Sequence, residues 1–386
     1  MFGFGQVASF DYFAHVKRAL AARFENTGLT LALHVVDVLP TASVRRRAVA
    51  LAELIAQTAE GDEAIHLLGH STGGLDARLV ASPATRSIDA AKLAWLPQLR
   101  SVTTMNTPHY GTPLASFFAT VNGQRVLAAL SALTVAGLTL GAQPLAAASV
   151  VLGFFSSSDQ ALPFKVKALD RSVKSIVGLV DDARSPEVRT FLGAIEDDQG
   201  SMLQLSPEAM DLVVAGFEDR PGVRYQATVS MSPTPTPQRW LKTIGHPWHA
   251  VSLSLFYALH RVTTKVPERY PCAASRGLQP WAGDEIETLL AKQFGMITGL
   301  DANDGIVPVR SQLWGDVVWA GFGDHLDVLG HYSDERDTEQ VAPELRHRDW
   351  LVSGSNFGTR EFTALMDAIA TGMLTSSSDI RPRRTS

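Results

Sequence analysis

Cysteine is nearly absent from this chain, whose 386 residues include a single one, Cys272. One cysteine excludes an internal disulfide framework and a cysteine-based metal cluster. Charged residues make up only 19% of the chain, the formal net charge is -5, and the two signs are mixed, so nothing indicates a nucleic-acid partner. The first residues lack the basic segment and apolar core that are typical of a secretory signal, which leaves the location open between secreted and cytoplasmic.

A long stretch over residues 126–155 has no charge at all, and its length would suffice to span a bilayer. Gly137, Gly141 and Pro144 interrupt it. These interruptions favour two apolar helices that meet near residues 141–144 over a membrane span. A membrane-anchored protein is the alternative.

The apolar pattern over residues 29–105 predicts strand, helix, strand, helix, strand. The expected strands are residues 29–38, 65–68 and 99–105, and the expected helices between them are residues 44–59 and 75–80. Such alternation is typical of a parallel sheet with crossover helices. The hydrophobic content of 45% fits a globular domain of this kind.

The alternation stops at residue 112, and residues 112–220 are Ala/Leu-rich without a convincing strand. We therefore expect a single α/β domain over residues 1–374, with a core of about 1–111 and 221–374 and a helical insertion of about 112–220. The insertion is predicted to cover the carboxyl end of the sheet as a lid or cap; the alternative is that its helices fill out the core. Residues 375–386, rich in Ser and Arg, are predicted to be a disordered tail.

The segment Gly69-His70-Ser71-Thr72-Gly73 follows a short apolar run and precedes a helix-like stretch. It is a G-x-S-x-G motif in a strand–turn–helix context, which places a serine Oγ at the end of a sheet. The glycines on either side are expected to let strand and helix approach without Cβ clashes. A plain strand–helix turn is the alternative.

A serine hydroxyl needs a histidine base, which in turn needs a carboxylate, and on this type of sheet the chain order is Ser, acid, His. Asp304, in an Asn-Asp-Gly turn, is the candidate acid, with Asp301 as its competitor. His325 follows the last strand-like run and is the candidate base, with His331 as its competitor. An Asn-Asp-Gly segment alone is an ordinary turn, so its position in this order is what favours Asp304.

An oxyanion formed by the attack of Ser71 needs donors that are already in place. One is expected to be the backbone N–H of Thr72. The second normally comes from a loop after an earlier strand, near the N-terminus.

Five blocks of sequence together resemble the bacterial triacylglycerol lipases, which have the α/β-hydrolase fold. The blocks are residues 69–74 (GHSTGG), 106–112 (NTPHYGT), 303–308 (NDGIVP), 325–327 (HLD) and 1–4 (MFGF). The resemblance implies a mostly parallel sheet flanked by helices and a lipase or carboxylesterase activity. It implies Ser71 as nucleophile, Asp304 as acid and His325 as base.

The sequence departs from that family at its first residue. The family's N-terminal strand and His-Gly oxyanion segment have no counterpart, and Met1 falls at the position of the first oxyanion donor. We expect the natural chain to begin further upstream. If Met1 is the true start, Phe2 or Gly3 would have to donate.

These lipases often carry a structural calcium ion. Asp327 and Asp284 match its carboxylate ligands, whereas His331 falls where the family has a side-chain amide. Two carboxylates with carbonyls suit calcium. The alternative is that Asp284 is a helix N-terminal charge and that Asp327 hydrogen-bonds its own loop.

The sequence therefore predicts hydrolysis of acyl glycerols or other apolar esters, with contact to a lipid surface. The chemistry of the triad requires no cofactor. Acyl transfer at the same site is one alternative, and a non-catalytic lipid- or partner-binding relative of the hydrolases is another.

Overall fold

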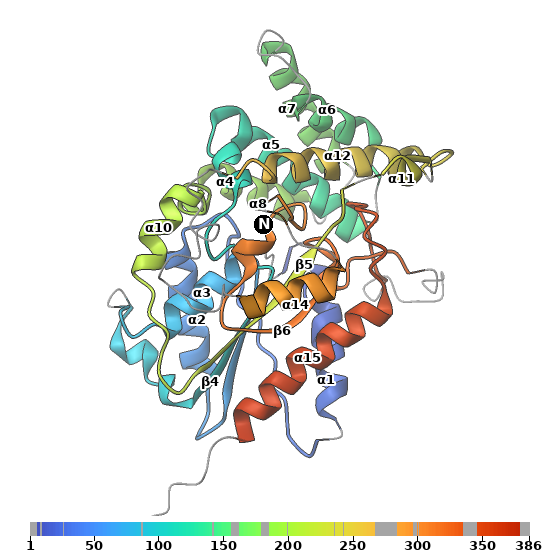
Figure 1. The fold of residues 1–386 in the computed structure, drawn as a ribbon. Helices are drawn as coiled ribbons and strands as arrows, with labels where there is room; N and C mark the ends of the chain where they lie inside the picture. The colour runs from blue at the N-terminus through green and yellow to red at the C-terminus, as the bar shows by residue number, and fades with distance from the viewer. Residues whose placement is uncertain are drawn as a thin grey trace, which may run out of the picture.

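A sheet of four parallel strands forms the centre of the computed structural model (Figure 1). The strands are β3 (Ile65–His70), β4 (Leu99–Met105), β5 (Arg224–Met231) and β6 (Asp316–Phe322), and they lie in the order β3-β4-β5-β6. All three pairings are parallel, so the carboxyl ends of the strands meet at one edge. The structure describes residues 6–7, 10–25, 27–85, 88–140, 143–155, 162–178, 185–198, 200–234, 236–241, 243–266, 284–295, 299, 301–334 and 346–378.

Helices cover both faces of this sheet. On one face α2 (Val44–Thr58) and α3 (Thr72–Ala81) pack together, and an apolar cluster joins them to Leu67 and Val102 of the strands. On the other face α15 (Thr359–Ser378) contacts β4, β5 and β6 and packs on α1 (Ala14–Phe24). The helix α14 (Asp284–Phe294) lies against β6. The predicted parallel sheet flanked by helices is therefore confirmed.

The expected strand at residues 29–38 is wrong. This segment has no regular secondary structure, and Leu29 and Leu33 are 53% and 38% exposed. An extended segment becomes a strand only when a neighbouring strand satisfies its backbone groups, and no described strand pairs with this one. Before it, β1 (Gln6–Val7) and β2 (Phe10–Asp11) form a separate antiparallel pair.

The described chain between β4 and β5 contains helices joined by short loops, and no strand is found among its described residues. In Figure 1 these helices lie above the sheet together with α11 (Pro237–Leu241) and α12 (Pro247–Thr263). Among the described helices none is long and apolar enough to cross a membrane. The role of the segment as a lid stays a prediction. Its elements are α4 (Pro113–Phe118), α5 (Val121–Val135), the π-helix η3 (Ala136–Leu140), α6 (Leu145–Phe155), α7 (Leu162–Val177), α8 (Ser185–Asp197), α9 (Gly200–Gln204) and α10 (Pro207–Ala215).

The final helix is longer than expected. The predicted disordered tail begins at residue 375, but α15 continues to Ser378. Ser376 and Ser377 each donate a hydroxyl hydrogen bond to a helix carbonyl four residues earlier, and Ser377 Oγ also bonds Nε2 of His66 in β3 at 3.0 Å. The bond to His66 is a tertiary contact that helps to extend the helix through residues of poor helix propensity. The remainder of the predicted tail, residues 379–386, lies outside the described residues.

Candidate active site

Ser71 occupies a sharp turn between the end of β3 at His70 and the start of α3 at Thr72. Its backbone has φ 54° and ψ −129°, a region that residues with a Cβ rarely adopt. The Ser71 N–H donates to the carbonyl of Met105 at 2.8 Å, which ties the turn to the end of β4. A non-glycine residue held in this conformation between a strand and a helix is the geometry of a nucleophile elbow.

The glycines around this turn contribute unequally. A Cβ on Gly69 would lie 2.4 Å from the backbone of Gly73 and Gly74, and a Cβ on Gly74 would lie 2.1 Å from the hydroxyl of Thr107. A Cβ on Gly73 would have no heavy atom within 4 Å. The expectation that both motif glycines prevent clashes therefore holds for Gly69 and is wrong for Gly73, because Gly74 rather than Gly73 makes the close approach.

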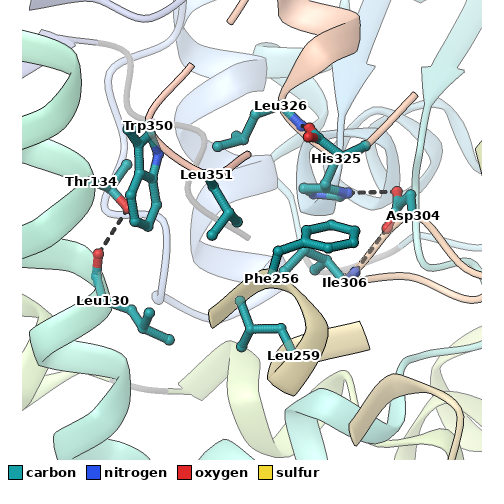
Figure 2. Close-up of a pocket in the computed structure, with 11 residues that line it drawn as sticks. Leu130, Thr134, Phe256, Leu259, Asp304, Ile306, His325, Leu326, Trp350 and Leu351 are labelled. Atoms are coloured by element: carbon teal, nitrogen blue, oxygen red, sulfur yellow. Dashed lines mark hydrogen bonds and ion pairs between the residues drawn. The ribbon is translucent and has the colours of Figure 1, made fainter. Parts of the chain in front are cut away.

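Asp304 and His325 form a buried pair at the carboxyl edge of the sheet (Figure 2). The His325 Nδ1–H donates to Asp304 Oδ2 at 2.8 Å, and the two side chains are 3% and 0% exposed. Asp304 Oδ1 accepts backbone N–H bonds from Ile306 at 2.9 Å and Val307 at 2.7 Å. Three donors thus orient the carboxylate. Because Nδ1 of His325 bonds Asp304, the other ring nitrogen, Nε2, faces away from the carboxylate.

Burial dominates the protonation of this pair. It raises the pKa of the Asp304 carboxyl to about 7, and hydrogen bonds from Val307, Ile306 and Asn106 oppose that rise. Burial lowers the pKa of the His325 imidazole well below its ordinary value, so the ring is neutral near pH 7. A neutral imidazole beside a carboxylate is the form that accepts a proton.

Asn106, to which the sequence assigns no role, is a fourth donor to Asp304. It directly follows β4 and has φ 49°. Its Nδ2 donates to Asp304 Oδ2 at 2.8 Å and to Ser230 Oγ at 2.5 Å. Asparagine tolerates left-handed backbone better than most residues, so an Asn directly after a buried strand is the signal that could have indicated this position.

His70 contacts His325, the predicted base. Its Nε2–H donates to the backbone carbonyl of His325 at 2.9 Å, and the two ring centroids are 4.6 Å apart. Because His70 directly precedes Ser71, this contact joins the loop of His325 to the elbow.

The two competing residues lie elsewhere. Asp301 is exposed, and its backbone carbonyl accepts a bond from Asn303 at 2.8 Å. A ring nitrogen of His331 lies 3.3 Å from the carbonyl of Tyr12. Of the predicted oxyanion donors, Thr72 begins α3, where backbone N–H groups have no partner within the helix, and Met1 lies outside the described residues.

Two largely apolar cavities flank this site, and Ile306 borders both. We call the first the Ser71 cavity; it is lined by Ser71 and Thr72 together with residues of α4 and α9. We call the second the His325 cavity; it is lined by His325, Asp304 and residues of α5 and α12 (Figure 2).

The predicted calcium ligands are only partly described. The side chain of Asp284, at the start of α14, lies outside the described residues. Asp327 Oδ2 accepts bonds from the Asp324 N–H at 2.8 Å and the Ser355 hydroxyl at 2.7 Å, which fits the alternative that Asp327 holds its own loop. The described residues contain no group of three His, Cys, Asp or Glu side chains that could hold a metal ion. Calcium binding stays a prediction.

The parallel sheet, the elbow after β3 and the histidine–carboxylate pair at the same edge define an α/β-hydrolase fold. Neither a scan against protein-family models nor a search of curated proteins found a match.

Solved structures of similar fold include two bacterial lipases and a protein named EstA. Lipase 1 from Pelosinus fermentans is 14% identical over 98% of this chain and 96% of its own, with a TM-score of 0.47. The Staphylococcus hyicus lipase is 17% identical over 97% and 94%, with a TM-score of 0.44. EstA from Clostridium botulinum is 15% identical over 86% and 81%, with a TM-score of 0.43. What the chain does is therefore argued from its own site.

Proposed function

We propose that this protein is a serine ester hydrolase, a lipase or carboxylesterase acting on apolar esters, with Ser71, His325 and Asp304 as its triad. The single observation that carries the proposal is the pairing of a strained serine elbow with a buried histidine–carboxylate pair on the same edge of the sheet. Strained backbone at a non-glycine residue is typical of functional sites. The largely apolar linings of the two cavities favour an apolar substrate.

In the first half of the reaction, Ser71 Oγ attacks the ester carbonyl carbon while its proton passes to Nε2 of His325. Asp304 keeps its bond to Nδ1 and stabilises the imidazolium. The backbone N–H of Thr72 stabilises the oxyanion. The bond between the carbonyl carbon and the alcohol oxygen then breaks, and that oxygen takes the proton from His325 and leaves as the alcohol.

In the second half, water attacks the acyl–Ser71 carbonyl and gives one proton to His325. The bond to Ser71 Oγ breaks, Oγ recovers that proton, and the carboxylic acid is released. An alcohol in place of water would make the same site an acyltransferase, which is the second candidate function.

Turnover of p-nitrophenyl esters of short and long acyl chains tests the proposal. We expect Ser71→Ala to lower kcat/KM on the order of 10⁴-fold or more. Ser149→Ala, at an exposed serine of α6, is the matched control and should keep wild-type activity. Equal rates for wild type and Ser71→Ala would leave only the non-catalytic alternative. A rate that rises with chain length and with an oil–water interface would favour lipase over esterase, and ester exchange with added alcohols would favour acyl transfer.

A further inference from the structure

The His325 cavity is lined by Trp350, whose buried indole N–H the proposed reaction does not use. We propose that this cavity is a subsite for the alcohol part of the ester, and that Trp350 Nε1–H donates a hydrogen bond to an oxygen atom within that alcohol. This inference rests on the proposed function and adds a substrate class to it.

The positions of the nucleophile and the base assign the two cavities to the two halves of the ester. The acyl carbon bonds to Ser71 Oγ, so the acyl chain extends into the Ser71 cavity, which Ser71 and Thr72 line. The leaving oxygen takes its proton from His325, so the alcohol lies on the side of His325. The His325 cavity borders that residue, and Ile306 separates it from the Ser71 cavity.

Most of the His325 cavity is apolar, and its other polar side chains already have partners. The hydroxyl of Thr134 donates to the Leu130 carbonyl at 2.8 Å. Asp324 Oδ1 accepts the N–H groups of Leu326 and Asp327 at 2.8 Å and 2.9 Å. The Trp350 side chain differs: the residue is 6% exposed, and its Nε1 has no hydrogen-bond partner among the described residues.

A buried donor without an acceptor costs free energy, so such groups in native proteins call for an explanation. An incoming oxygen acceptor would satisfy this donor, whereas a methylene at the same place would not. The site therefore favours alcohols that carry an oxygen in addition to the ester oxygen, such as ethers or partial esters of polyols, over purely aliphatic alcohols.

The surrounding contacts hold Trp350 in place. Gly137 of the π-helix η3 packs so closely that a Cβ there would lie 2.6 Å from Trp350 Cβ. The hydroxyl of Ser252 in α12 donates to the Trp350 carbonyl at 2.9 Å and accepts the N–H of Val352 at 2.7 Å. Arg348 donates to the carbonyl of Leu138 at 2.7 Å. A donor fixed from both sides is pre-organised for recognition.

In Figure 2, Trp350 and Asp304 lie on opposite sides of the group of lining residues. The acceptor is therefore expected some atoms along the alcohol rather than next to the ester oxygen. A heptyl ester is compared with isosteric esters in which one methylene is replaced by an ether oxygen. Moving this oxygen along the chain from ester to ester measures where the acceptor lies.

We expect wild type to hydrolyse at least one ether ester with a kcat/KM about fivefold above that of the heptyl ester, the value of one ordinary hydrogen bond. Trp350→Phe keeps an aromatic ring without the N–H and should abolish the preference, measured as the ratio of kcat/KM for the ether ester to kcat/KM for the heptyl ester within the same variant. Trp95→Phe is the matched control, because the N–H of this buried tryptophan donates to the Lys92 carbonyl. Turnover without any preference in wild type, or an unchanged preference in Trp350→Phe, overturns the inference and leaves the ester hydrolase standing.

A second readout needs no turnover and separates the two failures. In Ser71→Ala protein, the indole ¹H–¹⁵N resonance of Trp350 is assigned by its absence from the spectrum of the Trp350→Phe variant. Titration with the ether esters should shift it downfield, whereas the heptyl ester should not produce that shift. If no ester is hydrolysed by wild type, the proposed function fails, and the shift alone decides whether the subsite exists.

Discussion

Replacing Asn106 with glycine tests how its side chain supports Asp304, the proposed acid of the triad. The change removes the Nδ2 donor that bonds Asp304 Oδ2 at 2.8 Å and Ser230 Oγ at 2.5 Å. The backbone φ of 49° is one that glycine adopts readily, so the substitution adds no strain to the loop after β4. The loss should therefore act on the site rather than on the fold.

The size of the effect follows from the charge of the acceptor. A hydrogen bond to a charged group contributes about 1.5–3 kcal/mol. In the transition state Asp304 is ionised and faces an imidazolium, so the loss of one donor should lower kcat/KM by about 10- to 100-fold.

The pH profile should move as well. Burial raises the pKa of Asp304 to about 7, and the bond from Asn106 opposes that rise. Without this donor the pKa rises further, and the form with an ionised carboxylate is populated only at higher pH. The acid limb of kcat/KM, which belongs to the coupled Asp304–His325 pair, should therefore shift upward by about 1–2 pH units.

A pH-stat assay of ester hydrolysis from pH 5 to 10 measures both quantities. Asn356→Gly is the matched control, because Asn356 is exposed, has φ 59° and lies outside both cavities. Its profile should coincide with that of wild type. An Asn106→Gly enzyme with wild-type kcat/KM and an unmoved acid limb would refute the reasoning, provided that its urea midpoint matches that of the control.

Two further predictions concern stability. Gly69→Ala should lower the free energy of unfolding by about 1–3 kcal/mol, because its Cβ would overlap the backbone of Gly73 and Gly74. Gly73→Ala should be neutral or stabilising, because Gly73 lies in α3. Equal urea midpoints for the two variants would contradict this prediction. Burial lowers the pKa of His331 from 6.5 to about 4, so the unfolded chain binds a proton at this ring more tightly than the folded chain does. The free energy of unfolding should therefore fall by about 2 kcal/mol when the pH is lowered from 7 to 5. His331→Asn should reduce the pH dependence of urea unfolding by that amount, and the exposed His34→Asn should not; an unchanged dependence in His331→Asn would show that this ring does not govern it.

The sequence was sufficient for the parts of the site that are encoded locally. The elbow needs a strand, a turn and a helix within a few residues, so the pattern around Ser71 predicts it. Asp304 and His325 are predicted by their order along the chain, because each follows a late apolar run. The structure adds the contact between them, at 2.8 Å.

The parts that failed depend on neighbours distant in sequence. Residues 29–38 have the alternation of a strand, but a strand also needs a partner. Asn106, His70 and Trp350 have no distinguishing spacing, and each is recognised only by the group that it faces across the fold. The close approach at Gly74 rather than Gly73 likewise depends on Thr107, far along the chain.

The long helical segment between β4 and β5 has a consequence for how the sheet can change over evolution. The two strands pair in parallel although roughly 120 residues separate Met105 from Arg224. Loop-closure entropy grows only with the logarithm of length, so this connection costs about 1 kcal/mol more than an ordinary crossover of about 30 residues. Helices can therefore be added to or removed from the wall of both cavities at little cost to the pairing of the strands, and the cavities can change shape while Ser71, Asp304 and His325 keep their places at the edge of the sheet.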